Sequence, residues 1–148
     1  MGTSTDALLF YGFEIPGGEN EGTPFWLKKG EEDDGDWEEF VASKLGVPKP
    51  TVEYSEETKP LYHAYWETKR EAVKKLGIEV VMHCHIDAPM YALAVKASAQ
   101  RAYRGSPVTL GPNALIVDPT WDQQLRDFAQ LVGVEMGQPT WILASYWG

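Results

Sequence analysis

The clearest pattern in the chain is an alternation of apolar and polar side chains between residues 78 and 87. A period of two is typical of a β-strand with one buried face. A second apolar stretch, residues 91–97, follows Asp87-Ala88-Pro89, which favours a turn. The two stretches predict a β-hairpin, and the second strand could continue through residue 104. The first strand has an apolar face of Ile78, Val80, Met82, Cys84 and Ile86 and a mostly polar face of Glu79, Val81, His83, His85 and Asp87.

Two further strands are predicted from apolar runs. Residues 6–15 contain an unbroken apolar run from Ala7 to Phe13, which is too short for a typical buried helix. It indicates a central strand that is covered on both faces. Residues 140–147 are apolar and aromatic, and we expect them to join the same sheet. Residues 108–117 are interrupted by Gly111-Pro112-Asn113, so two short extended pieces around a turn are expected there.

Three segments, 36–45, 58–76 and 120–132, carry apolar side chains at helical spacing. The first and the third open with Asp36-x-x-Glu39 and Thr120-x-x-Gln123, the pattern of a capping box. In that motif the first side chain accepts a hydrogen bond from a backbone N–H of the first turn. A glycine follows each segment directly, and glycine favours the left-handed conformation in which many helices end.

Together these elements predict one α+β domain over residues 1–148. We expect a mixed or mainly antiparallel sheet of four to six strands with about three helices packed on it. A chain of this length can bury a core without disulfides, and its single cysteine excludes an intramolecular disulfide. No run of about 18 apolar residues is present, so we expect no membrane helix, and we see no signal-peptide pattern.

The charge of the chain is uneven. The net charge is −9, and ten acids against two lysines give residues 14–39 a net charge of −8. An acidic protein is repelled by phosphate backbones, which argues against direct nucleic-acid binding. Residues 16–35 form the predicted acidic surface loop, which is either a solvated loop or a docking surface for a basic partner.

The docking interpretation assigns the partner-binding surface to acids of this segment and to two tryptophans beside them. These residues are Glu31, Glu32, Asp33, Asp34, Asp36, Trp26 and Trp37.

A candidate metal site lies on the polar face of the first hairpin strand. His83 and His85, two residues apart, are expected on the same face, with Asp87 continuing the line at the turn. Two imidazoles and a carboxylate can ligate a divalent ion. The alternative is a polar, half-exposed face without a metal. Cys84 is expected to point into the core as a small apolar side chain.

A candidate ligand site lies at the predicted end of the second hairpin strand. Arg101 and Arg104 could hold a phosphate or carboxylate, since guanidinium suits bidentate contacts with both. The alternative is ordinary surface charge. The sequence contains no P-loop, GxGxxG, GxSxG or HExxH motif, and therefore carries no signature of a common enzyme class.

The chain resembles a group of small uncharacterised proteins from phage and bacterial genomes. The resemblance is carried by the opening STDALLFYG, the central VVMHCHIDAPMYALAV, the RAYRG that follows, the helix PTWDQQLRDFAQLVGV and the closing aromatic strand. It covers most of the chain and implies a phage or mobile-element accessory protein, with no established activity and no catalytic residues to carry over.

The resulting expectation is a protein that binds, and inhibits or modulates, a machine of the host cell in the cytoplasm. A nucleic-acid-processing complex is the expected kind of partner, because an acidic surface complements its basic grooves. The alternatives are a metal-dependent hydrolase that uses His83, His85 and Asp87, and a protein that sequesters a small ligand or nucleotide. Only the hydrolase would require a cofactor, a divalent metal.

The acidic segment gives a direct prediction. Replacing the acids from Glu31 to Asp36 with their amides should weaken capture of a basic partner, because the attraction depends on opposite charge. Binding measured at low ionic strength, where screening is weakest, provides the check. Unchanged capture under those conditions would contradict the role of charge.

Overall fold

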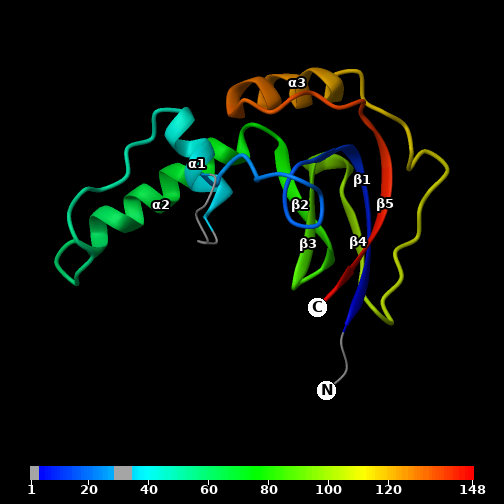
Figure 1. The fold of residues 1–148 in the computed structure, drawn as a ribbon, viewed down its shortest axis with the longest axis horizontal. Coiled ribbons are helices and arrows are strands. Elements are labelled where there is room, and N and C mark those ends of the chain that lie inside the picture. Colours follow the sequence, from blue (N-terminus) through cyan, green and yellow to red (C-terminus); the bar gives the residue numbers. More distant parts are fainter. Residues whose placement is uncertain (1–3, 29–34) are drawn as a thin grey trace.

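The computed structural model describes residues 4–28 and 35–148, in which five strands, three α-helices and a 3₁₀ turn are found (Figure 1). The elements are β1 (Thr5–Ile15), α1 (Trp37–Lys44), α2 (Lys59–Lys74), β2 (Ile78–His85), β3 (Ala88–Val95), the 3₁₀ turn (Lys96–Ser98), β4 (Gln100–Ala102), α3 (Trp121–Val132) and β5 (Thr140–Trp147). The strands form one mixed sheet, and the predicted single α+β domain is confirmed.

β1 is the strand that all the others except β2 pair with. Its first part lies between β5 and β4, with Leu8 opposite both Ala144 and Arg101. Beyond Leu9, β3 takes the place of β4 on the same edge of β1 and pairs from Gly12 to Ile15, so Gly12 lies opposite both β5 and β3. Thr5, Ala7 and Glu14 are exposed, but from Phe10 to Phe13 the residues on both faces of β1 are buried, as predicted for a central strand. An unbroken apolar run indicates such burial because a strand that is packed on both faces has no side chains in contact with solvent.

Four strands close into a ring. β3 pairs antiparallel with β1 and with β2, while β5 pairs antiparallel with β1. The ring closes where β2 and β5 meet in parallel at their last residues, Cys84 opposite Tyr146 and His85 opposite Trp147. Beside this closure, Ser4 and Gly148 exchange two backbone hydrogen bonds of 3.1 and 3.2 Å, so the described ends of the chain lie side by side (Figure 1).

The ring has an inner face and an outer face. We use "inner face" for the side of the strands that carries Leu8, Phe10, Ala92 and Ala94, all buried, with Ile142, Ala144 and Tyr146 packed against them. Small side chains such as alanine allow strands to curl closely around a narrow interior. The outer face carries the larger core, in which Phe13, Ile15, Leu93 and Val95 pack against Leu125 and Phe128 of α3.

The helices cover the outer face. α3 packs on β2 and β3, and α1 packs between α3 and α2. α2 extends away from the sheet beside α1, so its N-terminal end lies far from the strands (Figure 1). The predicted helix bounds are close to the observed ones, and Gly133 ends α3 with φ 76°, as its position after the apolar stripe indicated.

One predicted helix cap is wrong. Thr120 makes no side-chain hydrogen bond to α3, because Asp118 accepts hydrogen bonds from both the backbone N–H (2.8 Å) and the hydroxyl (2.6 Å) of Thr120. The Asp36 half of the α1 capping box is confirmed, since its carboxylate accepts from the Glu38 N–H at 2.9 Å, whereas the Glu39 carboxylate binds Lys49. The two extended pieces expected in residues 108–117 are also wrong, since that segment forms turns and irregular loop.

The predicted hairpin of β2 and β3 is confirmed, but the expected division of β2 into a buried and an exposed face is wrong. His83, expected on the polar face, is buried, whereas Met82 is 38% exposed and Cys84 is half-buried. The His83 side is covered because it belongs to the inner face of the ring. Cys84 has a left-handed backbone (φ 72°), which breaks the regular alternation where β2 joins β5.

Within the two described ranges, no helix is both long and apolar enough to cross a membrane.

The close approach of β3 to Gly12 gives a stability prediction. A Cβ at this position would overlap the carbonyl oxygen of Leu93, and backbone atoms of a paired strand cannot move aside. Gly12→Ala should lower the free energy of unfolding by about 2–3 kcal/mol, as measured by urea denaturation. Gly111→Ala is the matched control, since a Cβ added there would meet nothing within 4 Å, and a similar loss in both variants would refute the explanation.

Candidate functional site

The three predicted metal ligands are not brought together. His83 Nε2 is buried and lies 3.2 Å from Glu14 Oε1, but outside hydrogen-bonding alignment. His85 instead packs on the Trp147 ring, with centroids 4.5 Å apart, and its Nδ1 accepts a hydrogen bond of 3.0 Å from the Asp87 N–H. Cys84, which lies between the two histidines, has a left-handed backbone, so the side chains of His83 and His85 do not follow the regular alternation of a strand.

Only His85 and Asp87 are therefore neighbours, with 3.7 Å between Nδ1 and the carboxylate. Across residues 4–28 and 35–148, no three His, Cys, Asp or Glu side chains converge in an arrangement that could hold a metal ion. The geometry gives the hydrolase hypothesis no ligand set to build on.

Of the seven predicted partner-binding residues, the structure describes three. Glu31, Glu32, Asp33 and Asp34 lie outside the described residues. Asp36 caps α1 and forms an ion pair with Lys69 at 2.5 Å. Trp26 and Trp37 pack against the outer core, Trp26 edge-on to Tyr91 and Trp37 against Phe128. The three described residues are thus engaged within the protein.

A different surface presents aromatic side chains to solvent. Tyr54, Tyr62 and Trp66 contact one another at the N-terminal end of α2, with ring centroids 5.3–6.1 Å apart. Tyr54 is 49% and Trp66 38% exposed. We call these three residues, with the exposed Val52 and Leu61 beside them, the aromatic tip.

The aromatic tip is ordered and acidic. The Tyr62 hydroxyl donates a hydrogen bond of 2.7 Å to the Val52 carbonyl and so fixes the preceding loop onto the helix. Residues 53–67 contain four acids and one lysine, a net charge of −3. A groove of about 480 Å³ runs beside the tip between residues 47–52 and α2, and its lining is mostly apolar.

The two predicted anion-binding arginines have different surroundings. Arg104 is exposed and has no hydrogen bond or ion pair among the described residues. Arg101 lines a cavity of about 380 Å³ on the inner face, which we call the inner pocket. Its Nε and Nη2 donate hydrogen bonds of 3.0 and 2.6 Å to Oδ2 of Asp6, a carboxylate that is nearly fully buried.

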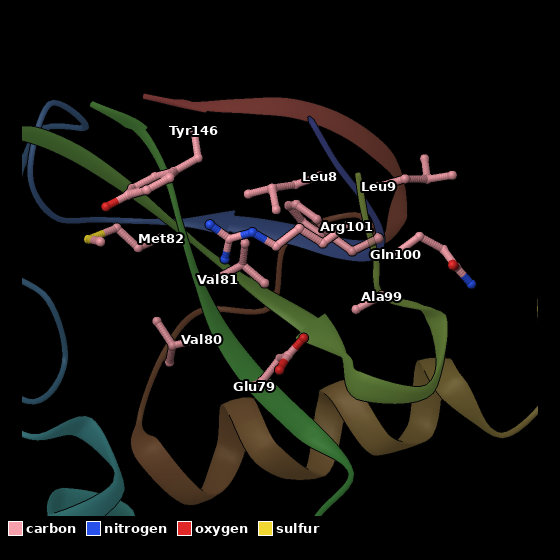
Figure 2. A pocket seen from close by; sticks show the side chains of 11 residues that line it. Leu8, Leu9, Glu79, Val80, Val81, Met82, Ala99, Gln100, Arg101 and Tyr146 are labelled. Atoms are coloured by element: carbon pink, nitrogen blue, oxygen red, sulfur yellow. The ribbon is translucent and has the colours of Figure 1, made fainter. Parts of the chain in front are cut away.

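The guanidinium of Arg101 is also held by aromatic rings. Its Cζ lies 5.3 Å from the centroid of Tyr103 and 5.4 Å from that of Tyr146, within the range of cation–π attraction. Figure 2 shows the side chain reaching across the pocket toward Tyr146. An ion pair and two rings together fix the position of an otherwise flexible side chain.

Glu79 is the second charged group of the inner pocket, and it comes from β2 (Figure 2). Burial raises the pKa of its carboxyl, and the nearby Lys96 opposes this by lowering it. The described residues contain no hydrogen-bond or ion-pair partner for this carboxylate. The rest of the lining is largely apolar and includes Leu8, Phe10 and Val81.

Sequence reasoning missed Asp6, Glu79 and Tyr146 as site residues. The sequence marks Asp6 only as the start of a strand, and its pairing with Arg101 spans 95 positions. The alternation of β2 does place Glu79 on the same face as Val81 and His83. That pattern alone cannot show that this face lines a pocket.

Comparisons with protein-family models, with curated proteins and with solved structures find no match.

Asp36 gives a prediction with a defined pH dependence. Burial would raise the pKa of its carboxyl, but hydrogen bonding and attraction to Lys69, with hydrogen bonds from backbone N–H groups, lower it overall. A lowered folded-state pKa means that the carboxylate stabilises the fold above the unfolded pKa, about 3.9, and that this contribution is lost as the pH falls.

Asp36→Asn keeps a capping side chain but removes the ion pair. It should lower the free energy of unfolding at pH 7 by about 0.5–1 kcal/mol, and the difference should shrink as the pH falls through the lowered pKa of Asp36. Urea denaturation at several pH values provides the measurement. Asp36→Ala should cost roughly 1 kcal/mol more, because the cap is lost as well. Equal stability of the Asn variant and the wild type at pH 7 would contradict a stabilising ion pair.

Proposed function

We propose that this protein acts by binding a protein partner that has a basic surface, and that the aromatic tip is the centre of the contact. The observation that carries the proposal is the exposure of Tyr54 and Trp66 in one cluster of rings within a segment of net negative charge. Tyrosine and tryptophan are enriched at protein interfaces, where a few such side chains supply most of the binding energy.

The order of the aromatic tip favours tight binding. The rings contact one another, and Tyr62 is held by the Val52 carbonyl, so little side-chain freedom is lost when a partner covers them. The groove beside the tip offers an apolar recess to a side chain of the partner. Exposed aromatic rings next to a recess are the arrangement that interface anchors require.

Charge selects the kind of partner. The net charge of −3 in residues 53–67 and of −8 in residues 14–39 both favour a basic surface and speed its association. A protein whose basic groove normally holds nucleic acid fits this requirement. With the resemblance to phage and bacterial accessory proteins, this leads us to propose a nucleic-acid-processing complex of the host cytoplasm, inhibited or modulated by the contact.

The test compares two tip variants in affinity purification from host lysate, with mass spectrometry and then direct titration of the recovered partner. Tyr54→Ser/Trp66→Ser removes the anchors, and Glu53→Gln/Glu56→Gln/Glu57→Gln removes the charge. We expect the first to weaken binding at least about tenfold, since interface anchors contribute on the order of 2 kcal/mol each. The second should weaken binding mainly at low salt.

Two matched controls change the same kinds of residues elsewhere. Leu115→Ser/Leu143→Ser removes exposed apolar side chains near β5, and Asp87→Asn/Asp127→Asn/Glu135→Gln removes three exposed acids outside residues 14–39 and 53–67. The proposal is supported if both control variants still capture a partner that the Tyr54→Ser/Trp66→Ser variant no longer captures. If all four variants capture the same proteins equally, the proposal is wrong.

A further inference from the structure

The inner pocket contains two opposite charges that do not neutralise each other. Arg101 uses Nε and Nη2 on Asp6, and among the described residues nothing accepts a hydrogen bond from Nη1. Within the described part of the chain, Glu79 forms no ion pair within 4 Å, whether with Arg101 or with Lys96. The Arg101 side chain is 43% exposed and Glu79 is half-buried, so both charged groups are accessible to a ligand that enters the pocket.

We infer that the inner pocket binds a small zwitterion, with a carboxylate on Arg101 and a protonated amine on Glu79. One molecule that carries both groups would supply the partner that each residue lacks. The cavity of about 380 Å³ lies within the usual range of small-ligand sites, roughly 300–1,000 Å³. The ligand class that this chemistry describes is an α-amino acid.

Charge balance favours a zwitterion over an anion. Asp6, Arg101 and Glu79 together carry a net charge of −1, because Asp6 already balances the guanidinium. A phosphate with two negative charges would be repelled by the Glu79 carboxylate, which carries that net charge, although Lys96 lies near it. A zwitterion adds no net charge, and its ammonium group is attracted to Glu79.

The shape and lining of the pocket define the rest of the ligand. Leu8, Phe10 and Val81 provide apolar contact, and Tyr146 adds an aromatic ring at the end of β5. Figure 2 shows Glu79 and Arg101 on different walls, contributed by β2 and β4, with Val81 between them. An apolar side chain on the ligand therefore suits this lining better than a charged one, and phenylalanine and leucine are the appropriate probes.

The site is preorganised by contacts that do not involve a ligand. The buried Asp6 and the rings of Tyr103 and Tyr146 hold the guanidinium in position. Holding a binding group in place before binding reduces the entropy lost on association. Arg104 has no such support and does not line the pocket.

The experiment titrates ¹⁵N-labelled protein with L-phenylalanine, L-leucine and two half-ligands. The half-ligand 3-phenylpropanoate lacks the amine, and 2-phenylethylamine lacks the carboxylate. We expect L-phenylalanine or L-leucine to shift the amide signals of Val81 and Arg101. The half-ligands should bind at least about tenfold more weakly than L-phenylalanine, the difference expected from one charge-assisted hydrogen bond.

Variants separate the two ends of the ligand. Glu79→Gln should weaken L-phenylalanine binding at least about tenfold and leave 3-phenylpropanoate binding unchanged. Asp6→Asn/Arg101→Gln should have the reverse effect. It should weaken the binding of L-phenylalanine and 3-phenylpropanoate and leave the binding of 2-phenylethylamine unchanged. The double change avoids leaving Asp6 buried and unpaired. Arg104→Gln is the matched control and should bind like the wild type.

Two results would overturn the inference. One is the absence of shifts in the inner pocket with either amino acid at about 10 mM, where even weak binding is visible. The other is a half-ligand that binds as tightly as L-phenylalanine. Because Glu79→Gln changes a partly exposed side chain with no hydrogen bond, it should remain folded and keep the test valid if the double variant unfolds. Neither result tests the proposal that the aromatic tip binds a protein partner, so the two proposals can fail independently.

Discussion

The structure depends on the way β1 is shared among its neighbours. β1 pairs with β5 on one edge, with β4 and then β3 on the other, and Gly12 lies opposite both β5 and β3. The absence of a side chain at this position allows the Leu93 carbonyl to approach the backbone closely. That approach lets β3 turn inward and the ring close, which creates the inner face and its pocket.

The same arrangement divides the molecule into two surfaces of different character. Closing the ring leaves the outer face to be covered by α1 and α3, and α2 is held mainly through α1. α2 therefore extends from the body and presents its N-terminal end to solvent (Figure 1). The inner face, by contrast, combines alanines with Leu8 and Phe10 and carries the Asp6–Arg101 pair. A large partner and a small ligand could each use one surface without competing for the other.

Local signals in the sequence predicted most of the fold. The apolar run of β1, the stripe of α3 and the Asp36 cap each depend on residues close in sequence, and each is found in the structure. The faces of β2 could not be predicted this way. His83 is buried because the pairing of distant strands closes the ring around the inner face, which no local pattern in β2 can show.

The candidate sites depend even more on long-range contacts. Arg101 is a candidate by residue type, but only its pairing with Asp6 distinguishes it from Arg104. The aromatic tip combines Tyr54, from an irregular loop, with rings of α2, and the apolar face predicted for that helix did not show which rings would remain exposed.

The pairing of Ser4 with Gly148 has a practical consequence. Any chain attached before residue 4 or after residue 148 leaves the body from one corner, beside the junction of β2 and β5. That corner and the N-terminal end of α2 lie on different parts of the molecule (Figure 1). A label or a surface linkage at either end would therefore orient the protein in the same way and leave α2 accessible.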